Sequence, residues 1–359
     1  MASEAAVAWP ITPPPVLPEP VPLPPLATER IVPRPAPDAP PHIALLLPLD
    51  SKRFGRHAAA VRNGFLAAAK TQGSGMPVRI HATGDDPEQA VHTYIDAVNA
   101  GARAVVGPLT RNSVAAVMGS AAVIVPTLAL NVPDGLAAPL LELYTFSLQV
   151  EAEARQVARL AYQEGYRRAV TISVDSPLFG RLLHAFVDEF TRLGGTHSAD
   201  HAFTSDPEGL TRIKTRLAAS TADVGFLALD FARARLARPY LGALAVYATS
   251  QVYPGNAGPL AAFDLGGVRF LDMPWLLQPD HPAVMIYPRP AYGDSVELER
   301  FYALGIDAYR ITAALLAGKA GTGLDGVTGK ITLGTDRQFE RSLTAAEFND
   351  GKLVVRERR

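Results

Sequence analysis

Hydrophobic and polar positions follow a regular order from residue 42 onward. Residues 43–47 form a continuous apolar run, which is typical of a strand buried on both faces of a sheet. Residues 58–70 then place Val61, Phe65 and Ala68 on one face of a helix. The order repeats, with strands predicted at 78–82, 104–106 and 123–130, and helices predicted from Asp85 to Gly101 and over 112–121.

A second series of alternating elements begins near residue 147. Asp85 in the first series and Ser205 in the second are expected to cap helices, because Glu88 and Glu208 follow three residues later. Helices are predicted at 151–164, 178–193, 205–219 and 296–316, and strands at 169–174, 201–203, 224–229, 243–248, 268–271, 329–333 and 353–355.

Repeated β-α-β units with short connections predict parallel sheets covered by helices. The fold class is therefore α/β, with two doubly wound, Rossmann-like lobes. We predict that residues 42–146 and 249–327 form the first lobe, and that residues 147–248 and 328–359 form the second.

Residues 1–41 precede these elements and are rich in proline from Pro10 to Pro41. Proline at this density prevents helices and central strands, so we predict a disordered tether in polyproline II, rising about 3.1 Å per residue. A passive spacer is the simplest interpretation. Residues 22–25, with the pattern PxxP, also fit a recognition ligand.

Composition narrows the choice of function. The 359-residue chain has no cysteine, which excludes disulfides, zinc–cysteine sites and iron–sulfur clusters. Its formal net charge of −1 argues against nucleic acid as the main partner, because phosphate binding needs a basic face. No apolar run approaches the ~18 residues of a membrane span. The first residues show no signal-peptide pattern, so the protein is either cytosolic or has lost a leader.

Two motifs resemble ligand sites, but we interpret both as structural. Residues 321–326 match G-x-G-x-x-G, but they follow a predicted helix and precede a strand, whereas a dinucleotide site needs the opposite order. His197 and His201 are four residues apart without a helix to bring them together, so we expect no metal site. The chain also lacks a phosphate-binding loop and a nucleophile elbow, so we expect no cofactor, no catalytic residues and no enzyme activity.

Polar residues gather where the predicted strands end. In open α/β sheets, ligands bind beyond the carboxyl ends of the strands. Residues 110–113 also open a helix, whose free N–H groups could hold a carboxylate. Helix caps and loop polar groups would give the same pattern. The candidate cleft residues are Asp50, Ser51, Leu109, Thr110, Ser113, Asn131, Ser176, Asp230, Ser250, Gln251 and Tyr253.

The order of elements resembles the type I periplasmic binding proteins of the leucine-binding class. Within that class, the chain is most similar to the LppC/LpoA lipoprotein family. The similarity covers nearly all of residues 42–359, and residues 248–251 and 272–277 are its more specific segments. The other segments that carry it are residues 43–49, 60–65, 107–109, 303–309 and 326–329.

This resemblance implies a function and a location. It implies an outer-membrane lipoprotein in the periplasm that activates a class A penicillin-binding protein without catalysing a reaction, with its signal peptide and lipidated cysteine absent from this sequence and no other contact with a membrane. Relatives carry a helical-repeat domain where this chain has the proline-rich segment. The alternative is a solute-binding protein that holds an amino acid or a similar small polar ligand between its lobes.

Overall fold

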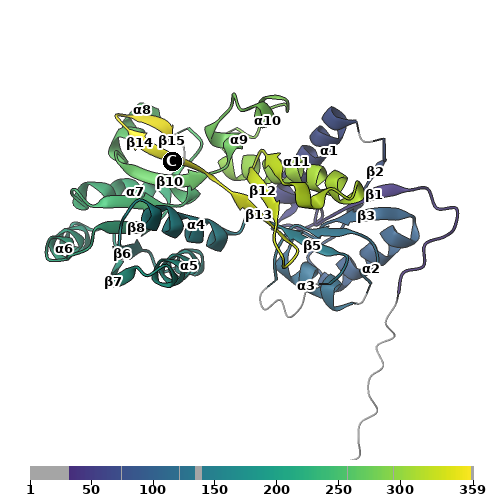
Figure 1. The fold of residues 1–359 in the computed structure, drawn as a ribbon, viewed down its shortest axis with the longest axis horizontal. Coiled ribbons are helices and arrows are strands. Elements are labelled where there is room, and N and C mark those ends of the chain that lie inside the picture. The colour runs from purple at the N-terminus through teal and green to yellow at the C-terminus, as the bar shows by residue number, and fades with distance from the viewer. Residues whose placement is uncertain are drawn as a thin grey trace, which may run out of the picture. The chain divides into compact units, whose positions relative to one another are not determined.

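The computed structural model describes residues 32–73, 75–120, 122–133, 140–256, 258–293 and 295–356 (Figure 1). Most of the predicted tether, residues 1–31, lies outside the described residues. Residues 32–41 contain no helix or strand. Among the described helices, none is both long enough and apolar enough to cross a membrane.

The first lobe is built on an eight-stranded sheet with the order β11-β12-β13-β5-β4-β3-β1-β2. Alternate residues of β1 face opposite layers. Ile43 and Leu45 pack with helices α1 and α11, whereas Ala44 and Leu46 pack with α2 and face the α3 side. The elements are β1 (His42–Leu47), α1 (Gly55–Gln72), β2 (Val78–Ala82), α2 (Pro87–Asn99), β3 (Ala102–Val106), α3 (Arg111–Gly119), β4 (Thr127–Ala129), β5 (Leu143–Phe146), α11 (Val296–Leu316), β11 (Leu324–Gly326), β12 (Gly329–Leu333) and β13 (Gln338–Ser342).

The second lobe has a seven-stranded sheet with the order β15-β14-β10-β9-β8-β6-β7. Phe226 faces α4 and α5, and the next residue, Leu227, faces the α6 and α7 side. The elements are α4 (Val150–Gln163), β6 (Arg168–Ser173), α5 (Pro177–Arg192), β7 (Thr196–Ala202), α6 (Pro207–Ala218), β8 (Val224–Ala228), α7 (Phe231–Ala237), β9 (Ala245–Ala248), α8 (Gly258–Asp264), β10 (Val268–Asp272), β14 (Thr344–Asn349) and β15 (Lys352–Arg356). The short helices α9 (Pro274–Leu277) and α10 (Pro282–Met285) lie between β10 and α11 in the sequence, and their residues Trp275 and Val284 are buried in the core of the first lobe.

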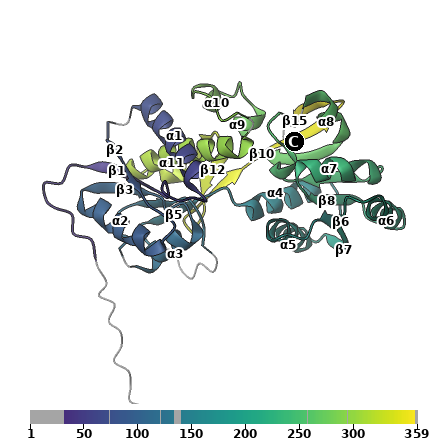
Figure 2. The ribbon, with the colours of Figure 1, turned by 180° about the vertical axis from the view of Figure 1, so that it is seen from behind.

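The mixed α/β fold with two doubly wound lobes is therefore confirmed, and Figure 2 shows the two groups of helices and strands from behind. The segment boundaries of the lobes differ from the prediction. β10, expected in the first lobe, pairs with β9 and β14 in the second sheet. β12 and β13, expected in the second lobe, pair with β11 and β5 in the first. The sequence pattern predicted β10 and β12 but carried no information on their partners, and it did not predict β13 as a strand.

Two predicted helix caps are displaced by one residue. The N-cap of α2 is Asp86, whose carboxylate accepts a hydrogen bond from the Glu88 N–H at 2.9 Å. In the same way, Asp206 is the N-cap of α6, and its carboxylate accepts a hydrogen bond from the Gly209 N–H at 2.8 Å. In both helices a proline takes the first helical position, which fixes the cap at the residue just before it.

Helices α1 and α11 pack closely through two glycines. A Cβ atom added to Gly64 would lie 1.9 Å from the Tyr302 carbonyl oxygen, and one added to Gly305 would lie 2.0 Å from the Val61 carbonyl oxygen. Only residues without a side chain allow this approach. The pair of helices covers one face of the first sheet and connects the start of the chain to its last third (Figure 1).

Candidate functional site

A cavity of about 470 Å³ lies between the two lobes. Three of the predicted cleft residues, Leu109, Thr110 and Asn131, line it from the ends of β3 and β4. Glu151 and Arg181 line it from the second lobe, the first in the opening turn of α4 and the second in the N-terminal part of α5. This is the position that the carboxyl-end rule gives for a ligand in a doubly wound fold.

The polar side chains from the first lobe already have partners. Thr110 caps α3: its hydroxyl accepts from the Ser113 N–H at 3.4 Å and donates to the Ser113 hydroxyl at 2.8 Å. The Asn131 amide donates to the Leu109 carbonyl at 2.9 Å. Ser113 is buried behind Thr110. The Asn131–Leu109 bond holds the loops after β3 and β4 together. The hydroxyls of Thr110 and Ser113 are bonded to each other in the N-terminal cap of α3.

Two predicted residues after β1 lie outside the cavity lining. Asp50 is exposed. Ser51 is buried, and its hydroxyl accepts from the N–H groups of Arg53 and Phe54, at 3.2 and 2.8 Å. Ser51 therefore shapes the turn that leads into α1.

The predicted residues of the second lobe also have structural positions away from this cavity. Ser176 caps α5 by accepting from the Phe179 N–H at 3.4 Å, and Asp230 caps α7 and binds Arg233. Tyr253 packs in the core, with its ring 5.5 Å from that of Phe270. The remaining two are Gln251, which is half-buried, and Ser250, which is bonded to Glu153.

An ion-pair bridge crosses the cavity from one lobe to the other. Glu151 Oε1 accepts from Arg111 of α3 at 3.3 Å and from Arg181 of α5 at 2.8 Å. We call these three residues the cleft bridge. Sequence reasoning missed it, although Arg111 directly follows the predicted site residue Thr110. Glu151 was predicted only as the first residue of a helix, where an acidic residue is ordinary.

The cavity has a positive rim. Arg53, Arg111 and Arg181 line it, as does His57. The His57 ring lies 4.8 Å from the ring of Phe301, and its Nε2 is 3.2 Å from Glu297. A ligand that matched this lining would carry a negative charge and would compete with Glu151 for the arginines.

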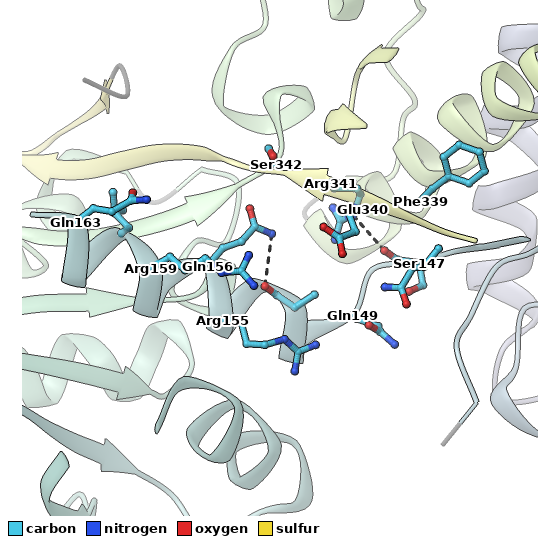
Figure 3. Close-up of a pocket in the computed structure, with 13 residues that line it drawn as sticks. Ser147, Gln149, Arg155, Gln156, Arg159, Gln163, Phe339, Glu340, Arg341 and Ser342 are labelled. Carbon is cyan, nitrogen blue, oxygen red and sulfur yellow. Dashed lines mark hydrogen bonds between the residues drawn. The ribbon is translucent and has the colours of Figure 1, made fainter. Parts of the chain in front are cut away.

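A second, smaller cavity of about 160 Å³ lies between α4 and β13 (Figure 3). The Arg341 Nε donates to the Ser147 carbonyl at 3.1 Å, and the Gln156 Oε1 accepts from the Leu343 N–H at 3.0 Å. Arg159 on the same helix forms an ion pair with Glu189 at 2.6 Å. The contacts of Arg341 and Gln156 hold α4 and the segment before it against the chain that passes from the first sheet into the second, and the Arg159–Glu189 pair joins α4 to α5.

The two motifs that we interpret as structural, residues 321–326 and the histidines 197 and 201, lie in a turn and in strands. Residues 321–326 form the end of a 3-10 turn and β11. His197 lies 3.2 Å from Asp200 on β7, whereas His201 is buried in the same strand. In the part of the chain that the structure describes, no cluster of histidine and acidic residues is arranged to hold a metal ion.

Comparison with known proteins gives the family. The family model described as "LppC putative lipoprotein" matches residues 37–228 and 228–351. Among curated relatives, the "Penicillin-binding protein activator LpoA" of Pectobacterium parmentieri is 24% identical over 334 residues, covering 78% of this chain and 48% of that protein. The protein of the same name from Haemophilus influenzae is 27% identical over 325 residues, covering 87% and 54%. The chain thus spans about half the length of the curated relatives it matches.

Solved structures agree with this assignment. A protein of Chromobacterium violaceum, described as a "putative branched-chain amino acid ABC transporter", is 41% identical with a TM-score of 0.74, covering 85% of this chain and 99% of that one. The C-domain of LpoA from Haemophilus influenzae, described as "a regulator of PBP1A", has the same fold, with 22% identity, a TM-score of 0.73 and coverage of 88% and 100%. The family model spans most of the described residues, and the chain therefore belongs to the LppC family.

Proposed function

We propose that this protein is a non-catalytic regulator of peptidoglycan synthesis that activates a class A penicillin-binding protein. It acts as a lipoprotein of the outer membrane, on the periplasmic side. Membership of the LppC family and the names of the curated relatives support this proposal. The matched LpoA C-domain, described as a regulator of PBP1A, corresponds to the two lobes of this chain.

The state of the interlobe cleft is the observation that favours a regulator. The hydroxyls of Thr110 and Ser113 bond to each other, and the cleft bridge joins α3 to α4 and α5 through Glu151. A solute-binding site places a small number of polar groups so that they face the ligand. Here the polar groups stabilise the protein itself, which suits a module whose outer surface contacts a partner.

The test is a binding and activity assay with a purified class A synthase. The protein should be retained by the immobilised synthase and should raise the rate of glycan polymerisation. Glu151→Ala is the matched variant: because activation does not use the cleft, this variant should activate as well as the wild type. Absence of both binding and rate change would exclude the proposal.

The second candidate is a solute-binding protein for an amino acid or a similar small polar ligand. The cavity of about 470 Å³ with three arginines in its lining favours it, since a carboxylate could replace Glu151 between Arg111 and Arg181. The 41% identical protein described as an amino acid transporter also fits it.

Thermal unfolding in the presence of an amino-acid panel separates the two candidates. A bound ligand at 100 times its Kd stabilises the folded state by about 2.7 kcal/mol. Arg111→Ala should remove that stabilisation if the ligand carboxylate binds in the cleft. The regulator proposal expects no change in the unfolding temperature with any amino acid.

A further inference from the structure

The cavity between α4 and β13 forms where β13 runs on beyond the strand beside it. β5 ends at Phe146, and its parallel ladder with β13 consists of two residue pairs, Gln338–Thr145 and Phe339–Phe146. β13 continues to Ser342, so its last three residues pair with β12 on one side and with no described strand on the other. The chain that leaves β5 turns into α4, and this helix forms the opposite wall (Figure 3).

The helix wall is the polar face of α4. Its lining residues recur three or four positions apart, which places them on one side of the helix. They are Ala152, Arg155, Gln156, Arg159, Leu160 and Gln163. The other side of α4 is apolar and packs in the core of the second lobe. The polar side therefore faces a cavity of about 160 Å³ that the chain itself does not fill.

Arg341 is the fixed cation on the strand wall. Its Nε donates to the Ser147 carbonyl at 3.1 Å and its Nη1 to the Thr328 carbonyl at 3.4 Å. In the described part of the chain, its Nη2 has no hydrogen-bond acceptor and no carboxylate lies within ion-pair distance of it. Three buried carboxylates act on its charge from farther away: Glu153, Asp272 and Asp307. Backbone carbonyls thus hold the guanidinium in place and leave one nitrogen for a ligand.

The helix wall adds further positive charge. Arg155 is half-buried and forms no hydrogen bond or ion pair with any described residue. Arg159 pairs with Glu189 at 2.6 Å, but Glu189 also pairs with Arg192 at 2.8 Å, so two arginines share one carboxylate. Of the residues that line the cavity, the one acid is Glu340, which is exposed. A concave surface with such an excess of arginine attracts anions.

The neutral lining and the volume narrow the class of anion. The side-chain amides of Gln149, Gln163 and Gln338 line the cavity without a partner among the described residues, and an amide can both donate and accept. Leu160 and Phe339 add apolar surface, which a carbon skeleton can contact and an inorganic anion cannot. A cavity of about 150 Å³ holds a molecule the size of benzene, so the bound group has about six heavy atoms.

Guanidinium groups bind carboxylates through two parallel hydrogen bonds. The ammonium group of a free amino acid would meet the excess positive charge, so the second polar group of the ligand must be neutral. We propose that the α4–β13 cavity is a binding site for a small carboxylate that carries a neutral hydroxyl or amide next to it. A hydroxy acid and the C-terminal residue of a peptide share this chemistry.

The site is separate from the interlobe cavity and from the regulator proposal. The two cavities adjoin at Ser147 and Gln149, but no arginine lines both of them. Variants of Arg155 and Arg111 can therefore distinguish ligands of the two cavities. The binding measurements need no synthase, so their failure would leave the regulator proposal untouched.

Ligand-observed NMR with the full chain tests the proposal. Saturation transfer to lactate and to N-acetylalanine, each titrated to about 10 mM, should give a Kd for at least one of them. Tighter binding of lactate would identify a hydroxy acid, and tighter binding of N-acetylalanine would identify a peptide C-terminus. Lactamide and N-acetylalaninamide lack the charge, alanine adds an ammonium group, and inorganic phosphate lacks the carbon skeleton. Each of these should bind at least about tenfold more weakly.

Arg155→Gln is the decisive variant. Because Arg155 contacts no other described residue, the fold should be unchanged, and the loss of one charge-assisted hydrogen bond should raise the Kd roughly 10- to 100-fold. Arg111→Gln is the matched control. It removes one arginine from the interlobe cavity and should keep the Kd of the wild type.

Three results would overturn the proposal. The first is the absence of saturation transfer to both carboxylates. The second is an unchanged Kd in Arg155→Gln, or an equal rise in Arg155→Gln and Arg111→Gln, which would place the ligand in the interlobe cavity. The third is binding of the neutral amides, alanine or phosphate as tightly as the carboxylates.

Discussion

At the scale of single residues, the role of each buried carboxylate in this protein depends on the hydrogen-bond donors that surround it. Asp307 on α11 is fully buried, and it accepts from the Val327 N–H at 3.1 Å, from the Thr328 N–H at 2.7 Å and from the Thr328 hydroxyl at 2.7 Å. It also pairs with Arg310 at 3.2 Å. One side chain thus satisfies the backbone of the turn between β11 and β12.

Asp307→Ala should therefore destabilise the protein by about 3–5 kcal/mol, because it leaves Arg310 and two buried N–H groups without an acceptor. The free energy of unfolding in urea measures this cost. Asp325→Ala, at a carboxylate that is 70% exposed, is the control and should change the value by less than about 1 kcal/mol. A similar cost for both variants would contradict the role given to Asp307.

The pKa of Glu189 is shifted downward, whereas burial raises the pKa of Glu153 to about 7. The Arg192 guanidinium, together with Arg159, lowers the pKa of Glu189 to about 2. Because this folded value lies below the unfolded 4.5, the stability from the carboxylate is present above pH 4.5 and is lost as the pH falls towards 2. In urea unfolding, the free energy of unfolding of the wild type should exceed that of Glu189→Gln above pH 4.5, and this difference should shrink as the pH falls towards 2. A difference that does not change with pH would contradict the stabilising role of the Glu189 carboxylate.

At the scale of elements, close helix packing depends on the two glycines of the α1–α11 pair. Gly64→Ala should push the helices apart and destabilise the protein by about 1–3 kcal/mol or more, because the added methyl group meets backbone that cannot turn away. Gly180→Ala in α5 is the control, since nothing lies within 4 Å of the new Cβ. It should be neutral or stabilise by up to about 1 kcal/mol, as measured by thermal unfolding.

The elements that sequence patterns could predict are those with strong internal periodicity. Residues 43–47 and the long helix over 296–316 were clear because each hydrophobic pattern is continuous. β13 and β14 were missed, since residues 338–349 mix charged and small residues with few apolar ones. Their strand conformation comes from pairing with β5 and β10, which are distant in the sequence.

The same limit applies to the candidate site. Thr110 and Asn131 could be placed at the cleft because the carboxyl-end rule depends only on the order of the strands. Glu151 and Glu153 could not, since a glutamate in the first turn of a helix is usually an exposed partner of the helix dipole. Their roles depend on Arg111, 40 residues away, and on Ser250, 97 residues away.

At the scale of the whole molecule, each sheet is assembled from distant parts of the chain. The second sheet needs β14 and β15, which follow the strands of the first sheet in sequence, and Ala346 and Phe348 are buried in its core. The two lobes are therefore not two consecutive halves of the sequence, and a cut in the chain cannot separate them cleanly.

Deletion of residues 344–359 should leave β10 at an open edge and expose the core of the second lobe. We expect a loss of more than about 3 kcal/mol in that lobe, since removal of a single buried phenylalanine side chain already costs that much. Limited proteolysis should then cut within residues 164–268 first. Val354→Ser, at a position 41% exposed on β15, is the control and should keep the protease pattern of the wild type.

The two ends of the fold respond differently to mechanical load. The chain enters the first lobe through β1, an inner strand bonded to β2 on one side and β3 on the other. A pull on residue 42 must shear both parallel ladders at once. The chain leaves through β15, an edge strand whose Arg356 lies opposite Ala345 in an antiparallel hairpin, so a pull there opens the hairpin one bond at a time. A protein held by its N-terminal segment would thus carry tension through a strand that is paired on both sides.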